Sequence, residues 1–319
     1  MTGYDVIGDV HGCADKLVGL LRQLGYREQA GAWRHPGRLA IFVGDLIDRG
    51  PQQVETVELV RRMVDSGTAR MVMGNHEFNA ISWATEDPSE PGEFMRTHHG
   101  RNGAKHRAQH ARFLAAVGEQ SAMHDEFIAW FTTLPMWMDL DGLRVVHACW
   151  HDASIDALPD VSGETPMTDE FVIEANRKGT KGYDAVEVSL KGPEVELGDH
   201  RPFLDKDGHR RTAARIRWWD AEAVTLRQLA EIPPGSNAPD GEPYPELPDE
   251  PCDAAEEYRY QGETPVVFGH YWRTESSVVL GHKAVCVDFS AVKHGPLVAY
   301  RWDGETSPTA SNFHAFGSE

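Results

Sequence analysis

The apolar positions in the first 75 residues alternate between short continuous runs and helical spacing. Three runs are too brief for helices and are rich in strand-forming residues: residues 4–7, 39–43 and 70–73. Between the first two runs, leucines from Leu17 to Leu24 recur at the spacing of an amphipathic helix, which Gly25 should end. We expect a second helix over residues 53–65. Strands that alternate with helices in this way predict βαβ units around a largely buried sheet.

Beyond residue 75 the pattern changes twice. Residues 77–134 show mainly helical spacing, interrupted by an acidic loop at 85–93, whereas residues 151–262 show little regular spacing. Within the latter stretch, the proline-rich segment 232–251 predicts an irregular loop, because proline removes a backbone donor and fixes φ. Four further runs have the length and composition of strands: residues 143–146, 266–268, 284–287 and 297–300. The whole pattern indicates an α/β fold with long insertions.

We interpret the chain of 319 residues as one domain followed by a short tail. The domain spans residues 1–305, with insertions at about 78–135 and 151–262, and residues 306–319 form the C-terminal tail. Hydrophobic residues make up 40% of the chain and charged residues 25%, which is typical of a globular protein with a sizeable core.

The formal net charge of −19 narrows the range of functions. A chain this acidic argues against a broad nucleic-acid or membrane-binding surface. It does not argue against an anionic substrate, because bound cations can reverse the local field at one site. Four scattered cysteines without a C-x-x-C pair indicate a reducing, cytoplasmic compartment. We also expect no secretion signal and no membrane span, since no apolar run approaches ~18 residues.

Each of the first three predicted strands ends in a polar turn that contains glycine: residues 8–12, 44–50 and 74–77. Because ligands of α/β proteins gather outside the carboxyl ends of strands, these turns should meet in space. They present a mixture of acidic, amide, imidazole and guanidinium side chains: Asp9, His11, Asp45, Asp48, Arg49, Asn75 and His76. Two later strands end in His147 and His270. Nitrogen and oxygen ligands of these kinds suit manganese, iron, zinc or similar divalent ions.

A single aspartate or histidine after a strand is more often a turn former or a helix cap than a metal ligand. Three such turns in order, followed by two histidines at strand ends, are hard to explain by turn chemistry alone. His282 and His294 compete with His270 for the last position, but only His270 follows a clear strand, at residues 266–268. His270 is therefore the favoured ligand.

The strings GDVHG, GDLIDRG and GNHE, followed by VVH and FGH, together resemble the pattern of the calcineurin-like metallophosphoesterases. The resemblance is to the branch that holds PPP-type protein phosphatases, symmetrical diadenosine tetraphosphatases and bacterial PrpE-type phosphatases. It covers residues 1–80 most fully, and residues 143–150 and 264–302 less fully. It implies an α/β fold built as a two-sheet sandwich, with a dinuclear metal site at the strand ends.

The resemblance also implies how two metal ions would be held. Asp9 and His11 would bind the first ion, and Asp45 would bridge both ions. The second ion would be completed by three further side chains: Asn75, His147 and His270. Manganese is the expected metal, with iron, zinc, nickel or cobalt as alternatives.

The remaining turn residues would act on the substrate. Arg49 would bind substrate phosphate bidentately, and Asn75 would contact the substrate as well. His76, oriented by Asp48, would protonate the leaving group. The insertions at about 78–135 and 151–262 would cover the site and determine which substrate is bound.

These roles describe a hydrolase in which a hydroxide that bridges two metals attacks phosphorus in line. Dinucleoside polyphosphates or related phosphate esters are the first expectation, because the turns at 44–51 and 268–270 look closest to those of tetraphosphatases and PrpE-type proteins. A Ser/Thr/Tyr protein phosphatase is the second expectation, and a phosphatase of polynucleotide ends is the third. A binding scaffold without activity is disfavoured by the presence of candidate ligands at all six metal positions.

Overall fold

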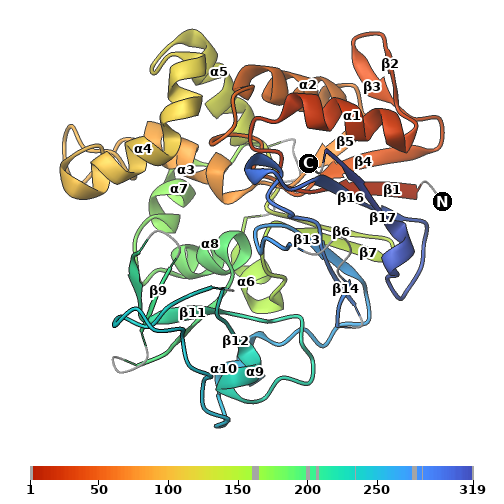
Figure 1. Cartoon of the computed structure of the whole chain (residues 1–319). Helices are drawn as coiled ribbons and strands as arrows, with labels where there is room; N and C mark the ends of the chain where they lie inside the picture. Colours follow the sequence, from red (N-terminus) through yellow and green to blue (C-terminus); the bar gives the residue numbers. More distant parts are fainter. Residues whose placement is uncertain are drawn as a thin grey trace. The chain divides into compact units, whose positions relative to one another are not determined.

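The three early apolar runs lie side by side in one five-stranded sheet of the computed structural model (Figure 1). The structure describes residues 3–159, 165–198, 202–205, 208–233, 235–274, 279–281 and 283–317. The strands of this sheet follow the order β17 (Phe313–Phe316), β16 (Leu297–Trp302), β1 (Gly3–Ile7), β4 (Arg38–Phe42) and β5 (Ala69–Met71). Because β1, β4 and β5 run parallel, they end at the same edge of the sheet.

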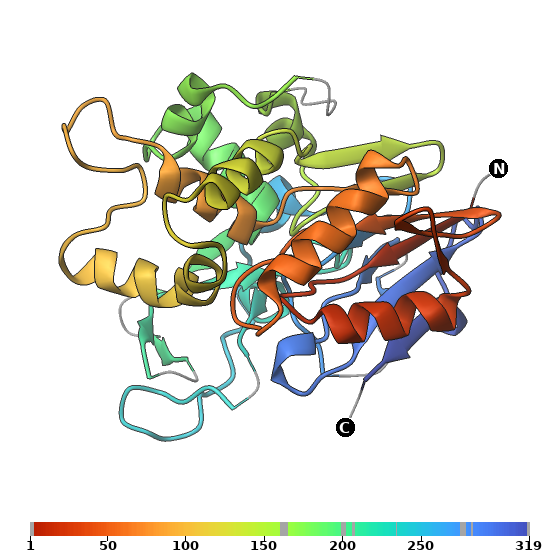
Figure 2. The ribbon, with the colours of Figure 1, turned by 90° about the horizontal axis from the view of Figure 1, so that it is seen from above.

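Two helices cover one face of this first sheet, namely α1 (Ala14–Leu24) and α2 (Gln53–Asp65), as Figure 2 shows from above. Gly25 ends α1 in the left-handed conformation that glycine adopts without strain. Both helices bury an apolar stripe against the sheet, so the expected βαβ arrangement is confirmed.

The later strand runs form a second five-stranded sheet. Its order is β14 (Val279–Leu280), β15 (Ala284–Cys286), β13 (Val266–Phe268), β7 (Leu143–Val146) and β6 (Trp137–Leu140). The three central strands β15, β13 and β7 run parallel, so β7 and β13 also end at one edge.

The two sheets share one apolar core. Val6 and Ile41 from the first sheet and Val145 and Val267 from the second belong to the same buried cluster, and none of these side chains is exposed to solvent. Burial of apolar surface is the main driving force for this packing. The predicted two-sheet α/β sandwich is therefore confirmed.

The stretch after residue 75 is helical, as its spacing predicts. It contains α3 (Asn75–Ala84), α4 (Gly100–Val117) and α5 (Ala122–Phe131), and the acidic loop at 85–93 separates the first two. Three further helices follow β7, namely α6 (Asp152–Ala157), α7 (Asp169–Ala175) and α8 (Lys181–Lys191). Over the part of the chain that the structure describes, no helix is both long and apolar enough to cross a membrane.

The chain divides into two units: Met1–Lys191 with Thr264–Glu319, and Gly192–Glu263. The second unit has a sheet of its own, in the order β12 (Ala230–Glu231), β11 (Ala213–Ile216) and β8 (Glu194–Glu196). It also contains β9 (Phe203–Leu204), β10 (Arg210–Arg211), α9 (Leu226–Leu229) and α10 (Ala254–Tyr258). Its core includes Leu197, Phe203 and Leu247. The interpretation of residues 1–305 as one domain stays a prediction.

The structure contains several short strands that the sequence pattern does not predict. The hairpin β2 (Arg27–Gln29) and β3 (Ala32–Arg34) follows α1, and β6 pairs with β7. β17 lies within residues 306–319, which we expect from the sequence to form a tail, and it pairs antiparallel with β16. Strands of three or four residues carry too few positions to show a periodic pattern.

Candidate metal centre

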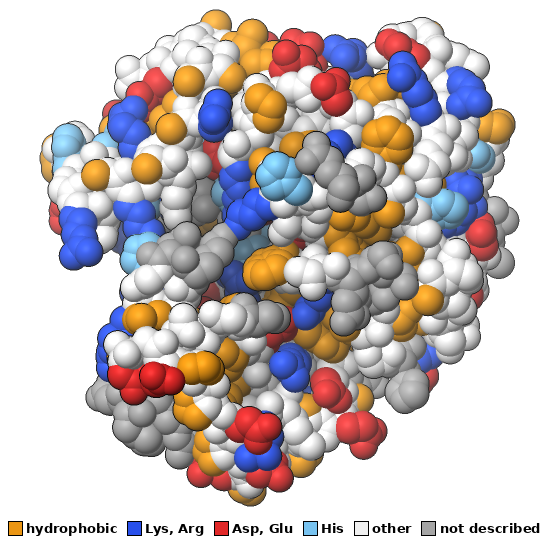
Figure 3. Space-filling view, in the orientation of Figure 1, with side chains coloured by type: hydrophobic (Ala, Val, Ile, Leu, Met, Phe, Trp, Pro, Cys, Tyr) orange, Lys and Arg blue, Asp and Glu red, His pale blue; other side chains and the backbone are white. Residues whose placement is uncertain are grey.

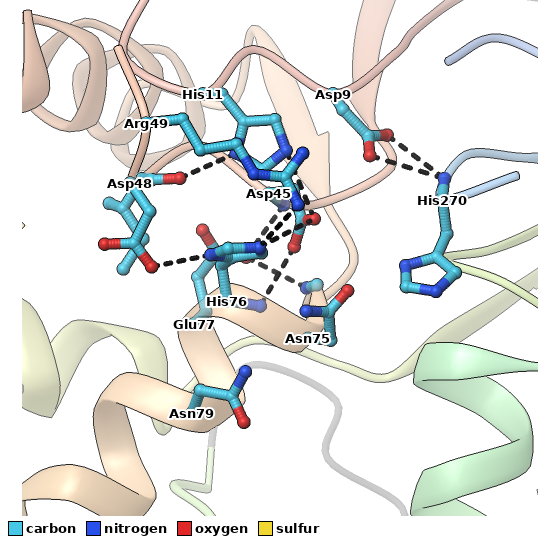
Figure 4. Close-up of polar contacts among 12 residues, drawn as sticks. Asp9, His11, Asp45, Asp48, Arg49, Asn75, His76, Glu77, Asn79 and His270 are labelled. Atoms are coloured by element: carbon cyan, nitrogen blue, oxygen red, sulfur yellow. Dashed lines mark hydrogen bonds and ion pairs between the residues drawn. The ribbon is translucent and has the colours of Figure 1, made fainter. Parts of the chain in front are cut away.

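The polar turns at the strand ends meet at one place with His270, which follows β13 (Figure 4). His147, which follows β7, belongs to the same cluster. Two groups of side chains have ligand atoms within 4.8 Å of one another. The first group is His11, Asp45 and His76, and the second is Asp45, His147 and His270. Asp45 belongs to both groups, so its carboxylate lies at the centre of the cluster.

Five of these turn residues adopt backbone angles that L-amino acids normally avoid. The φ angles are positive at His11 (46°), Asp45 (53°), Asp48 (67°), Arg49 (66°) and His270 (61°). Such conformations cost of order 1–3 kcal/mol each and cluster at functional sites, where the surrounding structure enforces them. The fold therefore holds these side chains in place at a cost in stability.

Glu77 enforces part of this backbone geometry. Its fully buried carboxylate accepts hydrogen bonds from the backbone N–H of Asp45 (2.8 Å), Leu46 (2.8 Å) and Gly74 (3.0 Å). Burial and the charge of Asp45 raise the pKa of the Glu77 carboxyl to about 7, although the backbone donors act in the opposite direction. One carboxylate thus ties the turn after β4 to the turn after β5.

Two glycines allow the acidic side chains to approach the backbone closely. A Cβ atom on Gly74 would lie 2.3 Å from both the backbone nitrogen and Oδ1 of Asp45. A Cβ atom on Gly269 would lie 2.2 Å from Oδ1 of Asp9. Any larger residue at either position would displace a carboxylate of the centre.

The imidazoles of His11 and His147 are both held by a hydrogen bond from Nδ1 to a backbone carbonyl. Nδ1 of His11 donates to the carbonyl of Ile47 at 2.8 Å, and Nδ1 of His147 donates to that of Val43 at 2.7 Å. A carbonyl oxygen can only accept, so each Nδ1 carries the proton and each Nε2 of a neutral ring presents a lone pair. Burial lowers the pKa of His147, and burial together with Arg49 lowers the pKa of His11 to about 3, which keeps both rings neutral.

These two lone pairs face the two oxygens of one carboxylate. Nε2 of His11 lies 3.6 Å from Oδ2 of Asp45, and Nε2 of His147 lies 3.5 Å from Oδ1. Nε2 of His11 is buried and has no hydrogen-bond partner among the described residues. Acceptors that face each other across such distances repel unless a cation lies between them. The side chains therefore fit two cations that share Asp45, and the backbone carbonyls orient the histidines as in metal sites.

Asp9 and Asn75 border the two groups. The carboxylate of Asp9 accepts from the backbone N–H of His270, at 3.3 and 3.5 Å, and burial and the charges of Asp288 and Asp45 raise its pKa. Oδ1 of Asn75 lies 3.1 Å from Nε2 of His147. The structure thus groups His76, rather than Asp9, with His11 and Asp45.

His76 and Arg49 lie beside this centre. Nδ1 of His76 donates to Oδ2 of Asp48 at 2.6 Å, and Nη2 of Arg49 donates to Nε2 of His76 at 3.2 Å. Burial lowers the pKa of His76, but Asp45 and Asp48 outweigh it and raise that pKa above its usual value. Asp48 therefore orients the imidazole of His76 through Nδ1, and Arg49 is hydrogen-bonded to its other ring nitrogen, Nε2.

A family model described as calcineurin-like phosphoesterase matches residues 4–270, which is most of the chain. The chain belongs to the calcineurin-like phosphoesterase family. The chain is also similar to curated proteins named asymmetrical bis(5′-nucleosyl)-tetraphosphatase PrpE. The relative from Halalkalibacterium halodurans is 54% identical over 74 residues, which cover 23% of this chain and 30% of that protein.

Two further PrpE relatives are similar over longer stretches. The protein from a Geobacillus species is 35% identical over 150 residues, which cover 45% of this chain and 55% of that protein. The protein from Bacillus subtilis is 29% identical over 171 residues, which cover 53% of this chain and 64% of that protein. The chain thus spans between about a third and two thirds of the length of these relatives.

His110 is a site residue of this calcineurin-like phosphoesterase that the strand-end motifs do not include. Its Nδ1 donates to Oδ1 of Asp48 at 2.8 Å, so the carboxylate that orients His76 is held by two imidazoles, one on each oxygen. Burial alone would raise the pKa of the Asp48 carboxyl, but these two hydrogen bonds lower it well below its usual range. The signal was present, because His110 lies on the apolar face of α4 with Phe113 and Val117.

Asp288 is a second residue near the centre that lies outside the strand-end motifs. It follows β15 as Asp9 follows β1, and it is 6% exposed. Its charge is the second cause, after burial, of the raised pKa of Asp9. Of the two histidines that compete with His270, His282 lies outside the described residues, and His294 belongs to neither histidine–aspartate group.

Proposed function

We propose that this calcineurin-like phosphoesterase hydrolyses phosphate esters and anhydrides through two divalent metal ions, and that dinucleoside polyphosphates are its substrates. The observation that carries the proposal is the position of Asp45, whose two oxygens face the lone pairs of two different imidazoles at 3.6 and 3.5 Å. Two cations that share one carboxylate are the arrangement used for in-line displacement at phosphorus.

The first ion would be held by Asp9, His11 and Asp45. The second would be held by Asp45 together with three later residues: Asn75, His147 and His270. Manganese is the proposed metal, because carboxylate, amide and imidazole ligands suit it, with iron, zinc, nickel and cobalt as alternatives. When bound, such ions activate water and stabilise the charge that develops on the phosphoryl oxygens.

Arg49, His76 and Asp48 would handle the substrate. Arg49 would transfer its hydrogen bond from His76 to a phosphate oxygen, for which a planar guanidinium is well suited. Nε2 of His76 would then be available to carry a proton to the leaving oxygen, while Asp48 holds Nδ1 at 2.6 Å. Asn75, the first residue of α3, would also contact the substrate.

The choice of substrate rests on the names of the PrpE relatives, each of which is a bis(5′-nucleosyl)-tetraphosphatase. The test is a panel of diadenosine tetraphosphate, phosphopeptides and 3′-phosphorylated RNA, assayed with chelator-treated protein before and after each metal is added. We expect no turnover without metal, the highest turnover with Mn²⁺, and the largest kcat/KM for diadenosine tetraphosphate. Full hydrolysis after exhaustive chelation would overturn the mechanism, and a preference for phosphopeptides would overturn the substrate.

We also propose a cytoplasmic location. The four cysteines are free thiols, and Cys149 and Cys286 are buried. Free buried thiols suit a reducing compartment, where disulfides are rare. Thiol titration of the unfolded protein, isolated under non-reducing conditions, should find four reactive groups per chain.

A further inference from the structure

Asn79 follows the candidate site residues along α3. It lies four residues after Asn75 and three residues after His76, so the helix places it on the same side, about 4.5 Å further along the axis than His76. Figure 4 shows its amide nitrogen on the side nearer His76 and Asn75, and its oxygen on the far side. Among the described residues, this amide nitrogen has no hydrogen-bond partner.

Arg96 fixes the orientation of Asn79. Nη1 of Arg96 donates to Oδ1 of Asn79 at 2.8 Å, and Nη2 donates to Oε1 of Gln109 on α4 at 2.9 Å. Because a guanidinium has only donors, the oxygen of Asn79 must face it, which leaves the amide N–H groups of Asn79 on the side of the metal centre. Two neutral amides therefore hold the guanidinium rigidly.

Arg96 is a partly buried cation without an ion pair to a described carboxylate. Burial lowers the pKa of its guanidinium, while the charges of Asp48 and Glu187 raise it. Both of these carboxylates already have closer partners, because Asp48 accepts from His76 and His110, and Glu187 pairs with Lys191. A cation that is held by neutral groups keeps its charge available for an anion.

The chain around Arg96 also favours anions. Residues 96–112 contain five arginines and lysines, four histidines and no acidic residue, in a protein whose net charge is −19. Figure 3 shows basic and histidine side chains over α4, at the left of the view. The side chains of this segment therefore add no negative charge that would repel a polyanion.

We propose that Asn79 and Arg96 form an anion-binding position that receives the leaving group of a phosphoanhydride substrate. The inference rests on the proposed function, in which His76 stands at the leaving oxygen. A phosphoanhydride leaves as a phosphate chain, whose further negative charges would reach past His76 to Asn79 and Arg96. An aryl or alkyl ester leaves without such charges, so this position selects anhydrides over simple monoesters.

The test compares two substrates in the metal-loaded full chain, diadenosine tetraphosphate and p-nitrophenyl phosphate. Arg96→Gln should lower kcat/KM for the tetraphosphate about tenfold, which corresponds to about 1.4 kcal/mol, and leave kcat/KM for the aryl ester within about twofold, since no anionic leaving group is lost. Asn79→Ala should act in the same direction with a smaller loss. The matched control is Arg101→Gln, which removes an exposed cation from α4 and should change neither substrate.

A second readout separates this inference from the choice of substrate. Tripolyphosphate, at a fixed excess of free Mn²⁺, should inhibit hydrolysis of p-nitrophenyl phosphate, and Arg96→Gln should raise its inhibition constant about tenfold, as the loss of one charge-assisted contact predicts. If the wild-type protein does not cleave the tetraphosphate, the substrate proposal fails, but this measurement still tests the anion position. Equal losses on both substrates, or an unchanged inhibition constant, would make Arg96 a structural link between α3 and α4. Asn79→Ala carries the test if Arg96→Gln does not fold.

Discussion

The strand-end turns and the helices α3 and α4 supply side chains to the same centre in different ways. The turns hold His11, Asp45 and Arg49 on strained backbone with positive φ, fixed by Glu77 and by glycines that tolerate no Cβ. His110 and Asn79, in contrast, lie within helices, on regular backbone. His110 reaches the centre through one hydrogen bond to Asp48, and Asn79 lies near it through its position on the face of α3.

This contrast separates two properties of the site: the binding of metal, and the rate or substrate preference of the reaction. The turns fix candidate metal ligands through strained backbone and buried hydrogen bonds, so changes to these ligands should abolish the chemistry. His110 and Asn79 act on groups that are already placed, so changes to them should alter rate or substrate preference and leave the metal content intact. Four substitutions test this division, beginning with the largest expected effect.

Asp45→Asn should have the largest effect, because one neutral amide cannot hold two cations close together. We expect loss of both metals and a fall in kcat of about 10³-fold or more, since two ions supply several kcal/mol of charge stabilisation. Elemental analysis and steady-state kinetics check this, with Asp125→Asn as the control because that side chain is 77% exposed. Two tightly bound metals with normal turnover in Asp45→Asn would contradict the shared role of Asp45.

His76→Asn should lower turnover of alkyl phosphates by about 10²–10⁴-fold, the usual contribution of general acid catalysis. Turnover of p-nitrophenyl phosphate should fall much less, because its leaving group departs without a proton. Single-turnover rates on both substrates, with metal analysis, test this, and His99→Asn is a control on an exposed imidazole. Equal losses on both substrates would make His76 a positioning residue, and loss of metal would make it a ligand.

Arg49→Ala should lower kcat/KM about 10²-fold on every phosphate substrate, because two charge-assisted hydrogen bonds to the phosphoryl group are lost. Metal content should stay unchanged, since no ligand is removed. Arg49→Lys should recover part of the activity, because it keeps the charge but not the planar fork. A fall in metal content with unchanged phosphate affinity would argue against this role.

His110→Phe should have the smallest effect, about a tenfold loss, because it removes one hydrogen bond to an ionised carboxylate. The loss should be larger on alkyl phosphates than on p-nitrophenyl phosphate, since His110 acts through Asp48 and His76. His110→Asn, which can keep a donor near Asp48, should restore most of the activity. In the double variant with His76→Asn, the His110→Phe loss should vanish. An additive loss would show that His110 acts elsewhere.

The sequence predicts the strand-end part of the site because its signals are local. Helix α2 spans residues 53–65 as expected, since its apolar stripe and its boundaries are both encoded within those residues. Likewise, each glycine-containing turn directly follows the strand that positions it. The backbone geometry that brings Asp9 or Asp45 to the centre is set within a few residues of each.

The helical part of the site depends on contacts between distant segments, which no local pattern encodes. His110 meets Asp48 across 62 positions of the chain, through the packing of α4. Similarly, β17 becomes part of the first sheet only because β16 offers it a free edge. The core of the second unit combines residues of loops, of a four-residue helix and of strands of two to four residues, in which periodicity cannot be recognised.

The repulsion between Asp45 and the lone pairs of His11 and His147 has a consequence for folding. It destabilises the folded chain without ions, but not the unfolded chain, in which these groups are far apart and hydrated. Metal ions should therefore act as ligands of the folded state, contributing about 2.7 kcal/mol for each independent site at a free concentration one hundred times the dissociation constant. The melting temperature should accordingly rise with metal concentration. The amount of folded protein in the cell would then depend on the supply of divalent ions.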